Sequence, residues 1–289
     1  MNIETSPMKD IPGQQIDWPG LTDEMTPTPD HGETSYVGRE RLTGKKALVT
    51  GGDSGIGAAT AIAFAKEGAD VAIAFLPEEQ PDAEHVRDVI EKAGRRAVLI
   101  PGDLRTEDEC HRTVSEAVEA LDGLDIVVNN AGYQWGRKQG LGEITADGLQ
   151  RTFQTNVYAT IWTTQAALPH LKAGASIINC TSIQAFDPSE ALMDYAATKA
   201  ALNNLTVSMA ADLGPKGIRV NGVAPGPVWT PLQPATKTVD SVEGMGTDTP
   251  LGRAGQPIEV ATAFVYLASD EASYVSATIL GVTGGRPVF

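Results

Sequence analysis

The sequence predicts a single α/β domain in which helices cover both faces of a parallel sheet of seven strands. From Lys45 onward, short apolar runs alternate with helical stretches, and glycine directly follows several of these stretches. Runs that are apolar throughout are typical of strands buried on both faces, as in a parallel sheet. The 289 residues suffice for one large doubly wound domain, and the alternating part shows no repeat or internal boundary.

The seven expected strands are the continuous apolar runs, at 47–50, 71–76, 97–100, 126–129, 176–180, 220–224 and 278–282. The expected helices lie between most of them, at 57–68, 83–93, 107–121, 147–171, 194–213 and 257–268. Gly68, Gly94 and Gly214 lie at the ends of three helices, where glycine commonly terminates a helix.

Two segments depart from this alternation. Residues 1–44 show no sustained helix or strand period, which is typical of a disordered tail. Their spaced apolar residues favour instead an extended arm that lies on the domain 45–289 or on a neighbouring subunit. Residues 227–250 predict a lid, with Trp229 to Thr249 lining a substrate pocket. The expected anchors of the arm are Ile16, Trp18, Leu21, Met25, Tyr36 and Val37.

The composition excludes several classes of partner. A net charge of −15 repels phosphate backbones and anionic membranes, which argues against nucleic acid and membrane binding. We expect a cytoplasmic protein, because no leader pattern is present and no apolar run approaches the roughly 20 residues of a membrane span. Cys110 and Cys180 suggest no disulfide framework, and the four histidines lack the spacing of metal ligands, so we expect no metal site.

The segment between the first strand and the first helix reads TGGDSGIG, from Thr50 to Gly57. Glycine lets the backbone approach a diphosphate closely, and the following helix start offers unpaired N–H groups. This placement is typical of a dinucleotide site, and the Lys-Ser/Thr ending of a nucleoside-triphosphate loop is missing. The candidate cofactor contacts in this loop are Gly51, Asp53, Ser54, Gly55 and Ile56.

The second strand ends in Leu76 and is followed by two acidic residues, of which Glu79 is the candidate for reading the adenosine ribose. An acidic group accepts a hydrogen bond from a 2′-hydroxyl and repels a 2′-phosphate. No Arg or Lys lies beside it, so the sequence favours NAD(H) and leaves NADP(H) possible. The alternative is that Glu78 and Glu79 are solvated loop charges.

The third and fourth strands end in further candidate cofactor residues. Asp103, with Leu104 beside it, is expected to contact the adenine edge, and the alternative is that Asp103 caps the next helix. Asn130, Ala131 and Gly132 follow the fourth strand, where small residues let a cofactor lie across the strand tips.

Tyr195 and Lys199 are four residues apart at the start of an expected helix, so they point the same way. A neighbouring ammonium lowers the pKa of a phenol, which makes the pair a candidate acid/base. Ser182 follows the fifth strand and can hold a substrate oxygen beside the phenol. Asn156 lies inside an expected helix, where it either bends the helix and holds a water against Lys199, or is simply exposed.

Taken together, these motifs resemble the short-chain dehydrogenase/reductase family. The match runs from about Leu42 to the C-terminus and includes all the motifs above in order, together with PGPVxT from Pro225 to Thr230. Residues 25–36 and the GGDSG run look like a bacterial subgroup with an N-terminal extension, whose members are described as glucose-dehydrogenase-like, general-stress or aldehyde-reductase proteins.

The resemblance implies a Rossmann-type fold, a carbonyl or alcohol substrate and a homotetramer. It implies that Tyr195 is the acid/base and that Lys199 lowers its pKa and holds the nicotinamide ribose. Ser182 would orient the substrate oxygen, and Asn156 would complete a proton relay. The residues that would position the nicotinamide carboxamide are Pro225, Gly226, Val228 and Thr230.

Two other functions compete with this one. A nucleotide sensor or scaffold could retain the fold without catalysis, although the complete Asn–Ser–Tyr–Lys set argues against that loss. A sugar-nucleotide epimerase or dehydratase would need a larger C-terminal substrate domain than the residues after Lys199 supply.

Overall fold

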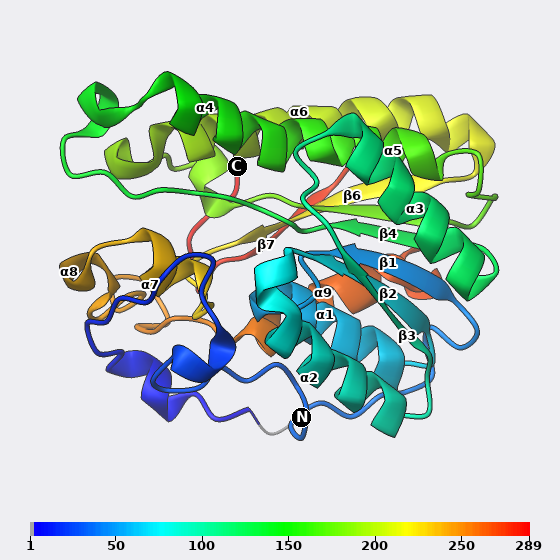
Figure 1. Cartoon of the computed structure of the whole chain (residues 1–289), viewed down its shortest axis with the longest axis horizontal. Helices are drawn as coiled ribbons and strands as arrows, with labels where there is room; N and C mark the ends of the chain where they lie inside the picture. The colour runs from blue at the N-terminus through cyan, green and yellow to red at the C-terminus, as the bar shows by residue number, and fades with distance from the viewer. Residues whose placement is uncertain (1–2) are drawn as a thin grey trace.

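The computed structural model describes residues 3–289 and has a parallel sheet at its centre (Figure 1). The strand order is β3-β2-β1-β4-β5-β6-β7, which confirms the seven-stranded doubly wound prediction. The order reverses between β1 and β4, the point where such sheets open a crevice at their carboxyl ends. The strands are β1 Lys46–Thr50, β2 Asp70–Phe75, β3 Ala97–Pro101, β4 Ile126–Asn129, β5 Ser176–Cys180, β6 Arg219–Pro225 and β7 Ile279–Val282.

Helices cover both faces of the sheet and bury one apolar cluster on each side. In Figure 1, α3 to α6 lie above the sheet, and α1, α2 and α9 lie below it. The helices are α1 Gly55–Lys66, α2 Gln80–Lys92, α3 Glu107–Leu121, α4 Ala146–Phe153, α5 Ala159–Ala167, α6 Met193–Leu213, α7 Leu232–Thr236, α8 Val239–Val242 and α9 Pro257–Ala268. Short 3₁₀ turns lie at Ser6–Lys9, Thr22–Glu24, Pro77–Glu79, Gly140–Glu143, Ile183–Ala185, Glu190–Leu192, Gly214–Lys216 and Asp270–Ala272.

Two expected segments differ in detail from the structure. The helix expected over 147–171 is interrupted by a π-helical turn, Gln154–Tyr158, which separates α4 from α5. Such turns interrupt the regular helix ladder and occur frequently at functional sites. The segment 227–250, expected as a loop, contains the two short helices α7 and α8.

Residues 3–44 lie against the domain body. Met8, Ile11 and Met25 are buried with Trp229 and other lid residues in a separate apolar cluster. Tyr36 is also buried, whereas Val37 is 69% exposed and anchors nothing, contrary to expectation. Within the described residues, no helix combines the length and apolar character that crossing a bilayer requires.

Candidate active site

A cavity of about 780 Å³ lies at the carboxyl ends of the strands, under the lid and the arm. Its volume falls in the range usual for ligand sites. Every candidate cofactor residue lines it, as do Ser182, Tyr195 and Lys199, whereas Asn156 lies outside the lining. The cofactor candidates brought together are Gly51, Asp53, Ser54, Gly55, Ile56, Leu76, Glu79, Asp103, Leu104, Asn130, Ala131, Gly132, Pro225, Gly226, Val228 and Thr230.

The glycine loop forms a tight cradle at the start of α1. Gly51 and Gly55 have φ of +61° and +51°, a region that side chains disfavour. A Cβ on Gly57 would lie 1.7 Å from the Gly51 carbonyl oxygen, so only glycine fits there. Ser54 precedes α1 without a side-chain cap, which leaves the first N–H groups of the helix for an anion. These residues fit a dinucleotide diphosphate.

The loop is fixed to the end of β4. The Asn130 side chain donates to the carbonyl oxygens of Thr50 and Gly51 over 3.0 and 2.9 Å. The Thr50 hydroxyl oxygen in turn accepts from the backbone N–H groups of Asn130 and Ala131. This exchange holds the strand tips on either side of the crevice in one arrangement.

Acidic side chains crowd the end of the cavity expected to bind the adenosine ribose. Burial raises the pKa of Asp53 to about 7, and one of its carboxyl oxygens has no hydrogen-bond partner. Burial and the neighbouring Asp53 raise the pKa of Glu79 to about 9, while its carboxylate accepts from the Leu76 N–H over 3.0 Å. A raised pKa weakens the charge repulsion expected between Glu79 and a 2′-phosphate, because a protonated carboxyl group carries no charge. Glu78, by contrast, is an exposed loop residue.

Asp103 does not cap α3. Thr106 does so, because its hydroxyl accepts from the Glu109 N–H. Asp103 instead accepts from the Arg105 side chain over 2.7 Å, and both residues line the cavity. Although burial raises the pKa of Asp103, the Arg105 hydrogen bonds outweigh burial and lower it. No sequence motif indicated Arg105. Its side chain donates to one oxygen of the Asp103 carboxylate, the group expected to contact the adenine edge.

Tyr195 and Lys199 project from the first turns of α6 into the same cavity. The Lys199 ammonium donates to the Cys180 carbonyl oxygen over 2.8 Å and lies 5.4 Å from the centre of the Tyr195 ring. Burial raises the pKa of Tyr195 above its ordinary value in this structure, and the expected lowering by Lys199 stays a prediction. The physical reason is that the phenol lies in a poorly solvated site while the ammonium is directed to a carbonyl.

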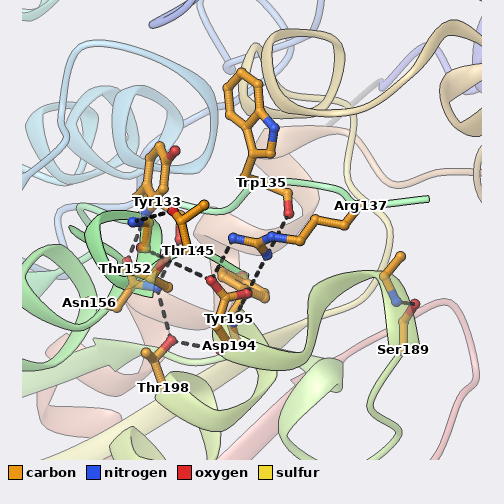
Figure 2. Close-up of polar contacts among 12 residues, drawn as sticks. Tyr133, Trp135, Arg137, Thr145, Thr152, Asn156, Ser189, Asp194, Tyr195 and Thr198 are labelled. Carbon is orange, nitrogen blue, oxygen red and sulfur yellow. Dashed lines mark hydrogen bonds and ion pairs between the residues drawn. The ribbon is translucent and has the colours of Figure 1, made fainter. Parts of the chain in front are cut away.

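Asn156 is fully buried in the π-helical turn, so its interpretation as an exposed helix residue is wrong. Its side chain bonds both the N–H and the carbonyl oxygen of Tyr133, over 2.7 and 2.9 Å, and donates to Thr198 (Figure 2). No direct bond joins it to Lys199 among the side-chain contacts of residues 3–289. Asn156 thus fixes the loop after Gly132 to α6.

A buried ion pair, which the sequence did not indicate, lies directly before Tyr195. The Arg137 guanidinium donates to both carboxylate oxygens of Asp194 over 2.7 and 2.9 Å, and Thr152 adds a third bond (Figure 2). Asp194 also accepts from the Tyr195 N–H. The network joins the loop after β4, α4 and the start of α6 at the residue that carries the phenol.

The lid and the arm contribute residues that sequence reasoning did not assign. Trp229 was expected to line the substrate pocket, but it is fully buried and its indole N–H donates to the Pro27 carbonyl oxygen of the arm. Trp18 and Pro19 of the arm do line the cavity, and so does Lys237, which lies within the lid segment expected to line it. Spaced apolar residues marked Trp18 as an anchor, and no local motif marked it as part of a site.

Comparison with known proteins identifies close relatives. A family model described as "Enoyl-(Acyl carrier protein) reductase" matches residues 51–286. An Escherichia coli protein named "Uncharacterized oxidoreductase YghA" is 53% identical over 278 residues, covering 96% of this chain and 94% of its own length. The "Glucose and ribitol dehydrogenase" of Daucus carota is 42% identical over 282 residues, covering 96% and 97%.

A solved structure extends the similarity to three dimensions. A short-chain dehydrogenase from Burkholderia cenocepacia, crystallised in complex with NADP, has a TM-score of 0.79 and 39% sequence identity. The match covers 85% of this chain and 98% of that one. The chain is therefore similar over nearly all of its domain to a dinucleotide-binding oxidoreductase.

Proposed function

Because the chain belongs to the short-chain dehydrogenase/reductase family of NAD(P)-binding oxidoreductases, we propose that it transfers a hydride between nicotinamide and a carbonyl or alcohol carbon. In this proposal Tyr195 is the acid/base. One observation carries the proposal: Tyr195, Ser182 and Lys199 line the same cavity as the glycine loop. A dinucleotide held by that loop would extend toward this end of the cavity, where the Tyr195 phenol would be available to a substrate oxygen.

The proposed chemistry divides between the ligand and the protein. A nicotinamide dinucleotide, when bound, supplies or accepts the hydride. Ser182 would orient the substrate oxygen by a hydrogen bond, and Tyr195 would give a proton to that oxygen in reduction and remove it in oxidation. Lys199, whose ammonium donates to the Cys180 carbonyl oxygen, would hold the nicotinamide ribose. Asn156, which lies in the π-helical turn, would complete a proton relay.

The proposal also includes a preference for NAD(H), a homotetramer and a cytoplasmic location. In it, residues 227–250 form a lid over the substrate, and residues 1–44 form an extended arm on the domain or on a neighbouring subunit. Glucose and ribitol belong in the substrate panel because of the name of the carrot relative. Simple aldehydes belong there because the proposed acid/base needs only a carbonyl oxygen that can accept the proton of Tyr195.

The test is Tyr195→Phe in the full-length protein, with NADH oxidation and NAD⁺ reduction followed by absorbance. We expect kcat to fall by about 10²–10⁴-fold, the usual contribution of a general acid/base, while NADH affinity stays within about twofold. Tyr158→Phe is the matched control, because that tyrosine is exposed and does not line the cavity. A Tyr195→Phe enzyme with normal kcat refutes the assignment. NADH binding without turnover of any panel member by the wild type would favour the scaffold alternative.

A further inference from the structure

The arm crosses the outer side of the cavity between residues 16 and 22. The Ile16 N–H donates to the carbonyl oxygen of Pro234 in α7 over 3.2 Å. The Thr22 N–H and hydroxyl both donate to the Asp82 carboxylate in the first turn of α2, over 2.9 and 2.8 Å. In Figure 1 the arm, in blue, runs beside the lid helices and passes toward α2. The segment therefore joins the lid to the ribose end of the cavity.

Between Ile16 and Thr22, the Trp18 side chain contacts Tyr133 and Arg151. Its ring meets Tyr133 edge to face, with ring centres 5.0 Å apart. The Arg151 guanidinium lies 5.0 Å from the Trp18 ring centre and 4.3 Å from that of Tyr133. Such contacts combine aromatic packing with cation–π attraction. Tyr133 follows β4 and Arg151 belongs to α4. Trp18 therefore connects the arm, which is bonded to the lid at Pro234, with the loop after β4 and with α4.

The segment 16–22 forms part of the cavity that contains the glycine loop. Trp18 and Pro19 line the same cavity as the glycine loop and as Leu104 and Ala131. The lid residue Thr230 lies against the loop, since a Cβ on Gly55 would be 3.0 Å from its side chain. Trp18 and Pro19, which are both partly exposed, therefore form part of the wall of the space that a dinucleotide would fill.

The contacts that hold the segment differ in strength from those that hold the rest of the arm. Met8, Ile11 and Met25 are buried in an apolar cluster with Trp229, Val242, Met245 and Ala254. Trp18 and Thr22, by contrast, are only partly buried and rely on a few hydrogen bonds and aromatic contacts. A segment with few buried apolar contacts between firmly held ends can open locally while the domain stays folded.

We propose that residues 16–22 form the roof of the dinucleotide groove, that Trp18 contacts the bound dinucleotide, and that this roof must lift for the dinucleotide to enter and leave. An indole provides a large flat surface on which a base or a nicotinamide ring can pack. The roof adds a contact that the domain 45–289 alone does not provide. It also makes the rate of cofactor exchange depend on the arm.

Two variants separate the contact from the gate, and both are measured by stopped-flow with NADH fluorescence in the full-length protein. Trp18→Ala removes the contact and also the aromatic packing that holds the roof, so we expect koff to rise more than kon and Kd for NADH to rise by about tenfold, the order found for one lost stacking contact. Thr22→Pro removes both donors to Asp82 at the first position of a 3₁₀ turn, where the preceding residue is already extended and proline is tolerated. For it we expect kon and koff each to rise about threefold, with Kd nearly unchanged, because only the opening becomes easier.

Trp135→Ala is the matched control, since Trp135 is 43% exposed and does not line the cavity. Trp18→Phe covers the case in which the alanine variant is unstable, and it should fall between wild type and Trp18→Ala. NADH rates within twofold of wild type in the Trp18 variants would overturn the contact. Unchanged kon and koff in Thr22→Pro would overturn the gate. A rise in substrate KM alone would assign the roof to the substrate instead and would equally contradict the proposal.

Discussion

The two ends of the cavity differ in whether their buried acidic side chains are paired with a cation. Beside Tyr195, Arg137 and Asp194 satisfy each other through two parallel hydrogen bonds, and both side chains are buried. At the ribose end, Asp53, Glu79 and Asp82 lie close together, their hydrogen-bond partners are backbone and hydroxyl groups, and burial raises the pKa of each. One end pairs a cation with a carboxylate, whereas the other brings three acidic side chains together.

This difference matches what each end is proposed to do. A group that exchanges a proton with substrate must be held within a fraction of an ångström of its working position, and a bidentate ion pair at the neighbouring residue provides that constraint. The ribose end has only to bind, and its carboxyl groups can change protonation without disturbing the position of Tyr195. The comparison therefore predicts that the Tyr195 end governs stability and turnover, whereas the ribose end governs the response to pH.

The largest effect should follow from breaking the paired end. Arg137→Met leaves the buried Asp194 carboxylate without a cation, and we expect a loss of about 3–5 kcal/mol in unfolding free energy, measured by urea denaturation. Because Asp194 also accepts from the Tyr195 N–H, kcat should fall while NADH affinity is retained. Arg112→Met is the control, since its ion pairs with Glu109 and Glu116 are exposed and should contribute about 1 kcal/mol or less. Equal losses in the two variants would contradict the comparison.

A smaller effect should appear at the unpaired end as a dependence of stability on pH. The pKa of Glu79 is raised in the folded state to about 9, so the folded protein keeps a proton that the unfolded chain releases above its ordinary pKa of 4.5. Asp53 acts in the same direction up to about pH 7. Folding then binds protons, and stability is fully present below about pH 4.5 and falls as pH rises toward 9. Acidic groups with lowered pKa, such as Glu33 and Glu67 at about 2, lose their contribution only below this window.

Glu79→Gln should flatten that fall. We expect the variant to gain about 1–2 kcal/mol relative to wild type at pH 8.5 and little at pH 5, a figure reduced from the full linkage value because Glu79 is partly exposed and its pKa depends on the charge of Asp53. Glu78→Gln is the matched control, because this neighbour is exposed. Chemical denaturation at the two pH values measures both variants, and a pH-independent difference for Glu79→Gln would show that its carboxyl group is ionised throughout.

The sequence predicted the sheet, its seven strands and the set of residues that line the cavity, because these depend on local patterns. Continuous apolar runs specify buried strands, and glycine spacing specifies a backbone that turns closely around a phosphate. The sequence allowed two interpretations of Asn156, because a helix residue can face either the core or the solvent. Its burial comes from the π-helical turn, which rotates one extra residue toward the core and leaves no periodic signal in the sequence.

What the sequence could not predict depends on contacts between distant segments. Arg137 and Asp194 are 57 residues apart, and neither belongs to a motif. Trp229 lies in the expected lid but packs against the arm, because its indole N–H bonds Pro27, which is 202 residues away. The raised pKa of Tyr195 likewise arises from burial in the assembled cavity, whereas the Tyr–Lys spacing alone suggested a lowered one.

The smallest expected effect concerns the choice between NAD(H) and NADP(H). Near pH 6 Glu79 is neutral, so a 2′-phosphate meets a hydrogen-bonding acid there, and as pH approaches 9 it meets a growing negative charge. The ratio of the Kd for NADPH to the Kd for NADH should therefore rise by about fivefold between pH 6 and pH 9, a coupling of about 1 kcal/mol. Fluorescence titration of both cofactors measures the ratio, and Glu79→Gln should make it constant. A ratio that stays constant in the wild type would show that Glu79 does not read the ribose, and a ratio below one throughout would contradict the proposed preference for NAD(H).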